Sequence, residues 1–150
     1  MKVAIVGSRS IEKLPNQVIE RLKNLRPTHI ISGGAKGTDT LASLYAKENG
    51  IKLTEYLPDY EKYGKPATHI RNKEIVQNAD TIIIVWDGES KGTLNVKKLA
   101  KQMGKNFFFY KNGILFEGCE TIIQNSLFPF LVGVGTNYNN SDIFYRYTEH

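Results

Sequence analysis

Two runs of small and polar residues are suited to holding an anion, because each stands where an apolar stretch gives way to a helical pattern. They are residues 32–39 (SGGAKGTD) and residues 90–93 (SKGT). Glycine lets the backbone approach a ligand closely, and a helix start offers free N–H groups and the positive end of the helix dipole. A phosphate fits such a place, and we expect the loop of residues 33–38 to make the main phosphate contact.

Each run also has a simpler explanation. The glycines of the first run match neither the P-loop spacing GxxxxGK[ST] nor the dinucleotide-binding spacing GxGxxG, and a tight strand-to-helix turn uses glycine in the same way. Ser90 or Thr93 at a helix start is most often an N-cap. The two roles can coexist, because N–H groups left uncapped still meet a ligand.

Four cationic side chains lie in or near these loops: Arg9, Lys36, Arg71 and Lys91. Together they would offset the charge of a phosphate or a diphosphate. Arg71 precedes Asn72, and this pair combines a guanidinium that can hold a phosphate through two parallel hydrogen bonds with an amide that can read a base or ribose edge. A salt bridge from Arg71 to a nearby aspartate is the alternative.

Three carboxylates, Asp39, Asp59 and Asp87, each come soon after a predicted strand. They are placed to accept hydrogen bonds from ribose hydroxyls or to act as acid or base. For Asp39, the helix dipole alone would favour an acidic residue. Cys119 is the single cysteine and the three histidines are scattered, so the sequence predicts no disulfide, no metal site, no cofactor and no Ser-His-Asp or Cys-His catalytic set.

Alternating strands and helices must position these loops. Short apolar runs predict strands over residues 3–6, 28–32, 52–56, 81–86 and 106–110, and helical spacing predicts helices from Pro15 to before Pro27, from after Gly37 to Gly50, over 68–78, and from about 93 to Gly104. Short connections imply right-handed crossovers, and hence an α/β fold with a doubly wound parallel sheet of order 3-2-1-4-5. Residues 111–113 (KNG) then predict a hairpin turn that adds residues 114–116 as an antiparallel edge strand.

In such a sheet, ligands bind beyond the carboxyl ends of the strands, where connections diverge to opposite faces. With this strand order, the divergence brings residues 7–9 beside residues 87–93, and the glycine-rich run flanks them. The predicted ligand-binding residues are Gly7, Ser8, Arg9, Gly33, Gly34, Ala35, Lys36, Gly37, Thr38, Asp39, Arg71, Asn72, Asp87, Ser90, Gly92 and Thr93.

Length and charge set the wider frame. With 150 residues, 41% hydrophobic and 23% charged, the chain is the size of one soluble domain. It shows neither a membrane-length apolar run nor a secretion signal, so we expect it in the cytoplasm. Residues 1–110 hold 18 Lys and Arg against 11 Asp and Glu, a net +7, which favours anionic ligands.

The last 40 residues differ from the rest. Residues 111–150 carry a net −2, and six aromatic residues crowd between positions 128 and 147: Phe128, Phe130, Tyr138, Phe144, Tyr145 and Tyr147. We divide the chain into a core over 1–110 and an aromatic extension over 111–150, either packed on the core or placed at a dimer interface, and we expect a homodimer or a higher homo-oligomer. Lining of a ligand pocket is the third possibility for this segment. Nucleic acid is not the expected ligand, because the aromatic segment is acidic.

The motifs MKVAIVGSR, SGGAKGTDTLA, HIRNKEI, ADTIIIVWDG and SKGT, in this order, resemble the SLOG superfamily of Rossmann-like nucleotide-binding domains, and within it the YspA/YpsA-related branch. The resemblance covers roughly residues 1–110. It implies a nucleotide or a nucleotide-derived ligand, of the ADP-ribose type or a nucleoside phosphate, at the loops named above. SLOG domains that sense such signals in bacterial or phage conflict systems suggest a sensor or a sequestering module.

Two other relatives suggest alternatives. LOG-type phosphoribohydrolases carry PGGxGTxxE with a catalytic glutamate, whereas here Ser32 replaces the proline, an extra residue follows Gly34, and Leu41 stands in the place of the glutamate. Hydrolysis of a nucleotide is therefore the second hypothesis. DNA-processing Smf/DprA proteins share a GGAxGxD run and an RN helix start, which makes binding of single-stranded DNA a third and less favoured hypothesis.

Overall fold

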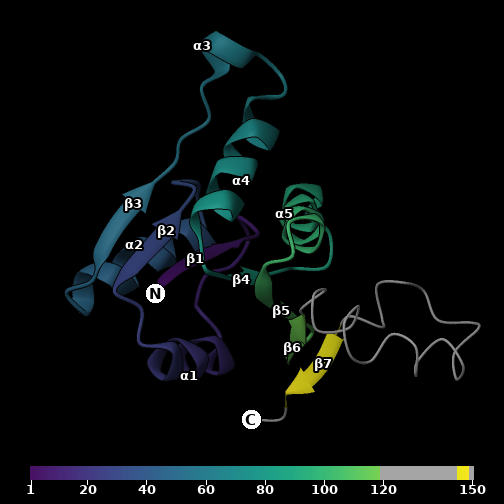
Figure 1. The fold of residues 1–150 in the computed structure, drawn as a ribbon. Coiled ribbons are helices and arrows are strands. Elements are labelled where there is room, and N and C mark those ends of the chain that lie inside the picture. Colours follow the sequence, from purple (N-terminus) through teal and green to yellow (C-terminus); the bar gives the residue numbers. More distant parts are fainter. Residues whose placement is uncertain (119–144, 149–150) are drawn as a thin grey trace, which may run out of the picture.

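The predicted α/β architecture is confirmed by a computed structural model, which describes residues 1–118 and the backbone of residues 145–148 (Figure 1). One sheet has the order β3-β2-β1-β4-β5-β6-β7. Its parallel part contains β3 (Lys52–Glu55), β2 (His29–Ser32), β1 (Lys2–Gly7), β4 (Thr81–Val85) and β5 (Asn106–Lys111), and β6 (Ile114–Gly118) and β7 (Tyr145–Thr148) follow antiparallel. The order 3-2-1-4-5 is the one that the sequence predicts.

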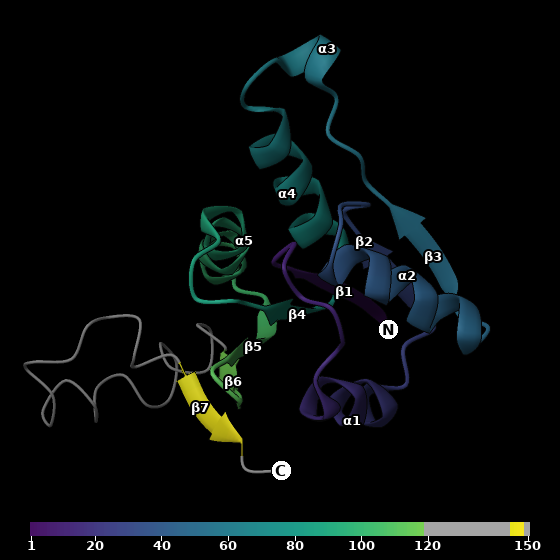
Figure 2. The same cartoon turned by 180° about the vertical axis from the view of Figure 1, so that it is seen from behind.

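Helices cover both faces of this sheet, as Figures 1 and 2 show from opposite sides. α1 (Asn16–Leu25) and α2 (Thr38–Glu48) pack on one face, and α4 (Ala67–Asn78) and α5 (Lys91–Gln102) pack on the other. The one-turn helix α3 (Tyr60–Tyr63) lies between the predicted strand over 52–56 and the predicted helix over 68–78, where the sequence predicts neither a helix nor a strand. A single turn carries no periodic pattern, so composition alone does not reveal it.

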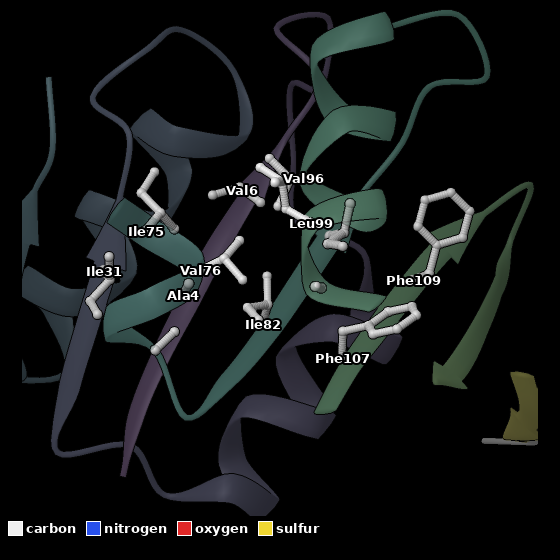
Figure 3. Close-up of a cluster of buried hydrophobic side chains, with 13 residues drawn as sticks. Ala4, Val6, Ile31, Ile75, Val76, Ile82, Val96, Leu99, Phe107 and Phe109 are labelled. Carbon is white, nitrogen blue, oxygen red and sulfur yellow. The ribbon is translucent and has the colours of Figure 1, made fainter. Parts of the chain in front are cut away.

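The central strand β4 explains why both faces need a cover. All five of its side chains are buried; Ile82 and Ile84 point into the cluster under α4 and α5, and Ile83 and Val85 point into the cluster under α1 and α2. Figure 3 shows the first cluster, which contains side chains of both helices together with Ala4 of β1 and with Phe107 and Phe109 of β5. Because successive strand residues face opposite sides, an unbroken apolar run marks a strand buried on both faces.

The predicted hairpin is confirmed as well. Asn112 and Gly113 both have positive φ, 51° and 80°, and join β5 to β6 with Lys111 paired to Ile114. Positive φ at both central residues is typical of a type I′ turn, which suits the twist of a two-stranded hairpin. β7 pairs with the outer side of β6, so the sheet continues one strand beyond the predicted edge.

Most of the aromatic extension, residues 119–144 and 149–150, lies outside the described residues, and the prediction that it packs on the core or at a dimer interface falls there. Cys119, Phe128, Phe130, Tyr138 and Phe144 are among these residues. Over the residues that are described, no helix has the length and apolar character needed to cross a membrane.

Candidate functional site

A cleft of about 100 Å³ opens beyond the carboxyl ends of the central strands, where the sequence predicts the ligand. It brings together the end of β1, the glycine-rich run after β2, the first half of α4 and the start of α5. Its lining contains the predicted residues Gly7, Arg9, Gly33, Ala35, Asp39, Arg71, Asn72, Ser90, Gly92 and Thr93. Segments from distant parts of the chain therefore share one site.

The cleft also contains residues that sequence reasoning missed, namely Val6, Thr68, Ile75 and Val96. The three apolar ones look like ordinary core positions in the sequence, and each is in fact buried in the cluster under α4 and α5. Only the strand order shows that this cluster ends at the cleft and provides its apolar floor. Thr68 lies in the first turn of α4. Its place at the start of a predicted helix is the only sequence feature that could have indicated it as a site residue.

Several predicted residues do not line the cleft: Ser8, Gly34, Lys36, Gly37, Thr38 and Asp87. Four of these residues belong to the glycine-rich run. Its backbone amides donate largely within the protein, from Gly34 to Ser32 Oγ (3.4 Å), from Ala35 to Asp39 Oδ2 (3.1 Å) and from Thr38 to the Ser8 carbonyl (3.3 Å). Oxygens of the protein itself therefore already accept from three of the amides that the glycine-rich run could have offered to a ligand.

Gly37 shows why glycine is needed in this run. Its φ is +73°, and a Cβ there would contact the carbonyl groups of Ser8 and Arg9. The glycine allows the β1–α1 loop to approach the start of α2, and Thr38 Oγ1 then donates to the Ser8 carbonyl (3.0 Å). Gly37 and Thr38 thus join two loops of the protein.

The second helix start, at α5, is arranged differently. Ser90 is its N-cap and accepts from the Thr93 amide through Oγ (3.3 Å), as the simpler explanation of this residue predicts. Gly92 in the first turn lines the cleft, and a Cβ built there would meet no atom within 4 Å. Among the described residues, this helix start therefore leaves space beside its first turn, and the positive end of its dipole lies at the cleft.

Asp87 holds the loop before α5 in shape. Its Oδ1 accepts from the amides of Glu89 and Ser90 (2.9 Å each), and its Oδ2 accepts from Ser10 Oγ (2.8 Å). These bonds, the amide bonds first, hold the pKa of this carboxyl well below its ordinary value. A carboxylate that stays ionised and is used in this way is a poor proton donor, so the acid or base role considered for Asp87 has no support here. Asp59 likewise caps α3, through the Lys62 amide (3.1 Å), and does not line the cleft.

Ser8 is buried behind the cleft and connects its walls. Its Oγ accepts from the Asp87 amide (3.0 Å) and shares a hydrogen bond with Thr93 Oγ1 (3.2 Å), and its amide donates to the Val85 carbonyl (2.9 Å). Together with the bonds from Thr38 to the Ser8 carbonyl, these contacts fasten the loops after β1 and β4 and the start of α2 to one residue.

Arg71 and Asn72 reach the cleft from α4. Arg71 Nη1 donates to the carbonyls of Gly33 (2.6 Å) and Tyr56 (3.3 Å), and its Nε donates to Asn72 Oδ1 (3.0 Å). Asn72 Nδ2 donates in turn to Asn95 Oδ1 (3.1 Å) on α5. The guanidinium is half-buried, and this burial lowers the pKa of Arg71. Arg71 is thus fixed through carbonyl groups rather than by the salt bridge considered as its alternative.

Asp39 is the most unusual group of the cleft. The residue is 5% exposed, Oδ2 accepts from the Ala35 amide, and Oδ1 has no hydrogen-bond partner among the described residues. Burial raises the pKa of this carboxyl, although the Ala35 amide and the Arg71 charge oppose the shift. A buried acceptor without a partner costs on the order of 1–3 kcal/mol, so a hydrogen-bond donor from a ligand would be favourable there.

Within residues 1–118, no group of three His, Cys, Asp or Glu side chains is arranged to hold a metal ion. The charged groups of the cleft lining are the Asp39 carboxylate and the guanidiniums of Arg71 and the exposed Arg9. Its neutral polar side chains are Asn72, Thr68, Ser90 and Thr93.

Residues 1–63 match the model of the YspA, cpYpsA-related SLOG family, the same family that the sequence motifs resemble. The matched part runs from β1 through α3 and contains Arg9, the glycine-rich run and Asp39. Arg71, Asn72 and the start of α5 follow it in the chain. No curated protein matches this sequence.

Proposed function

We propose that the cleft binds a nucleotide or a nucleotide-derived ligand, such as an ADP-ribose-type compound or a nucleoside phosphate, and that the protein acts as a sensor or sequestering module for it. The observation that carries this proposal is the unpartnered Oδ1 of buried Asp39, which shares one cleft with Arg71 and the start of α5. The oxygen requires a hydroxyl or amine donor, and the guanidinium and the helix start favour an anion. A sugar phosphate combines both kinds of group.

The phosphate is best accommodated at the start of α5. A Cβ added at any of the three glycines of the glycine-rich run would come within 3.0 Å of another atom, whereas a Cβ at Gly92, in the first turn of α5, would meet no described atom within 4 Å. Arg9 is exposed at the mouth of the cleft and Arg71 also lines it, from α4. We therefore move the main phosphate contact from residues 33–38, where the sequence places it, to residues 90–93.

The sugar then lies over Asp39. A ribose hydroxyl can donate to Oδ1 while Oδ2 keeps its bond to the Ala35 amide. The floor beneath, formed by Val6, Ile75 and Val96, offers carbon atoms to the less polar side of a sugar ring. Such a mixture of apolar surface and a few fixed polar groups is usual for small-molecule sites.

Hydrolysis of the bond between base and sugar is the second candidate, and one observation favours it. Asp39 combines burial with a raised pKa, the combination expected of a carboxyl that donates a proton. Leu41, standing where the phosphoribohydrolase motif has its glutamate, argues for binding without turnover.

Mass spectrometry of small molecules released from the heat-denatured protein tests the proposal most directly. We expect a nucleotide-derived compound, and incubation with nucleoside monophosphates, NAD or ADP-ribose should give a complex without products by chromatography. Free base that disappears in Asp39→Asn, while that variant still binds, would establish the hydrolase. Tight binding of oligonucleotides with a steep dependence on salt would instead support the DNA hypothesis and contradict ours.

A further inference from the structure

We propose that Tyr60 and Leu57 form the base-binding rim of the cleft, so that the ligand recognised there carries a planar nucleobase that stacks on the Tyr60 ring. This inference rests on the proposed function, because it concerns the part of the ligand that the cleft itself does not hold. It starts from the connection between β3 and α4, which extends beyond the carboxyl end of β3 and places α3 at the N-terminal end of α4 (Figures 1 and 2).

Two large apolar side chains of this connection are exposed. Leu57 is 67% exposed and Tyr60 is 57% exposed, the highest values among the large hydrophobic residues of the described chain. Both stand next to the cleft. Leu57 packs over Gly34, where any added Cβ would collide with its Cδ2, and Tyr60 OH shares a hydrogen bond of 3.1 Å with Thr68 Oγ1. Thr68 is itself part of the cleft lining.

The hydroxyl bond fixes the Tyr60 ring without covering it. A ring held by its polar end near the anion-binding groups, with its face open to solvent, presents a stacking surface at low entropic cost. Base–aromatic stacking of this kind tolerates any base, since every base has a π face.

Tyr63, in the same helical turn, serves as an internal comparison. It is 37% exposed, and the ammonium group of Lys62 lies 5.0 Å from the centre of its ring. The Tyr63 ring therefore already contacts a charged side chain. Among the described residues, Tyr63 makes no hydrogen bond to the cleft lining. The two tyrosines therefore differ in position while sharing residue type and helix.

The arrangement assigns each part of a nucleotide to its own place. The start of α5 takes the phosphate, Asp39 takes a ribose hydroxyl, and the rim at the α4 end takes the base. Removal of the base from the ligand, or of the ring from the protein, should therefore have the same effect on affinity, and the two changes together should have little further effect.

Calorimetry with AMP and ribose 5-phosphate tests this on the wild type, Tyr60→Ala, Tyr60→Phe and Tyr63→Ala. We expect Tyr60→Ala to weaken AMP binding about tenfold, from the loss of stacking, and to leave ribose 5-phosphate binding unchanged. Tyr60→Phe keeps the ring and should retain most of the AMP affinity, and Tyr63→Ala should match the wild type. Thermal unfolding checks that each variant is folded.

The outcomes separate the two proposals. Equal losses for AMP and ribose 5-phosphate in Tyr60→Ala, or no loss for either, would overturn the base-binding rim and leave nucleotide binding intact. The same holds if AMP binds the wild type no more tightly than ribose 5-phosphate. A wild-type protein that binds neither probe, nor ADP-ribose, would remove the proposed function and the rim together.

Discussion

The starts of α2 and α5 follow β2 and β4, and both present glycine and hydroxyl residues, yet they differ in how closely the protein packs around their glycines. At α2, amides of the glycine-rich run donate to oxygens of the protein itself, and a Cβ at Gly37 would collide with backbone carbonyl groups. At α5, amides also donate to protein oxygens, those of Asp87 and Ser90, but a Cβ at Gly92 would meet no described atom within 4 Å. The first start connects loops to each other, and the second leaves space beside its first turn.

This difference shows that glycine at a strand-to-helix junction has two separate uses. Gly37 is needed because its φ is positive and because the backbone of the β1–α1 loop lies against it. Gly92 has no such requirement within the described structure, so its lack of a side chain matters for the space it leaves. The two uses lead to opposite expectations for the same substitution.

The largest effect is expected for Gly37→Ala. The substitution would put a non-glycine residue at a positive φ, and the new methyl group would collide with the carbonyl groups of Ser8 and Arg9. The variant should therefore lose more than about 2 kcal/mol of unfolding free energy. Gly92→Ala, in the first turn of a helix, should instead be neutral or gain up to about 1 kcal/mol. Urea denaturation of both proteins measures the contrast. Similar losses in the two variants would mean that the helix starts are not used differently.

An intermediate effect is expected for Gly92→Glu. A carboxylate in the first turn suits the helix dipole and should not destabilise the fold, but it would repel a phosphate held there, and we expect AMP affinity to fall about tenfold, or about 1.4 kcal/mol. Gly92→Gln has almost the same shape without the charge and is the matched control. The comparison of the two by calorimetry isolates the charge. Equal AMP affinities of the Gly92→Glu and Gly92→Gln variants would place the phosphate elsewhere, with residues 33–38 as the next candidate.

The smallest effect concerns the stability of Asp39→Asn. Because the pKa of Asp39 is raised in the folded protein, the stability that it contributes is fully present below the unfolded pKa of about 3.9 and is lost as pH rises through the folded pKa. The variant, which does not ionise, should therefore be more stable than the wild type at pH 7, by less than about 1 kcal/mol, and this advantage should shrink toward pH 4. Thermal unfolding across this range measures it. An advantage independent of pH would show that Asp39 ionisation is not penalised by the fold.

Much of the fold follows from local patterns in the sequence. The apolar run of β4 predicts a strand buried on both faces, and Asn112-Gly113 predicts a tight hairpin, because both are consequences of nearest-neighbour geometry. The candidate site follows from such sequence patterns only in part. The strand order brings Arg9, Asp39 and Arg71 together as predicted, since parallel strands end at the same edge of a sheet.

The sequence does not reveal which hydrogen bonds each polar side chain makes. Asp87 and Asp39 are both predicted to follow strands, but Asp87 accepts three hydrogen bonds, whereas one oxygen of Asp39 has no partner in the part of the chain that the structure describes. That distinction depends on which amides point at each carboxylate, and backbone direction in a loop is fixed by tertiary contacts. The same reason conceals the apolar floor, because Ile75 and Val96 meet only after α4 and α5 pack on one face.

The hydrogen bonds of Ser8 restrict the movement of the cleft walls. One buried residue is joined to Val85, Asp87, Thr93 and Thr38, so that the loops after two strands and the start of a helix are held by the protein itself. The entropy of ordering these loops is therefore lost when the chain folds and not when a ligand binds. Such preorganisation raises the affinity of a site without any additional contact to its ligand.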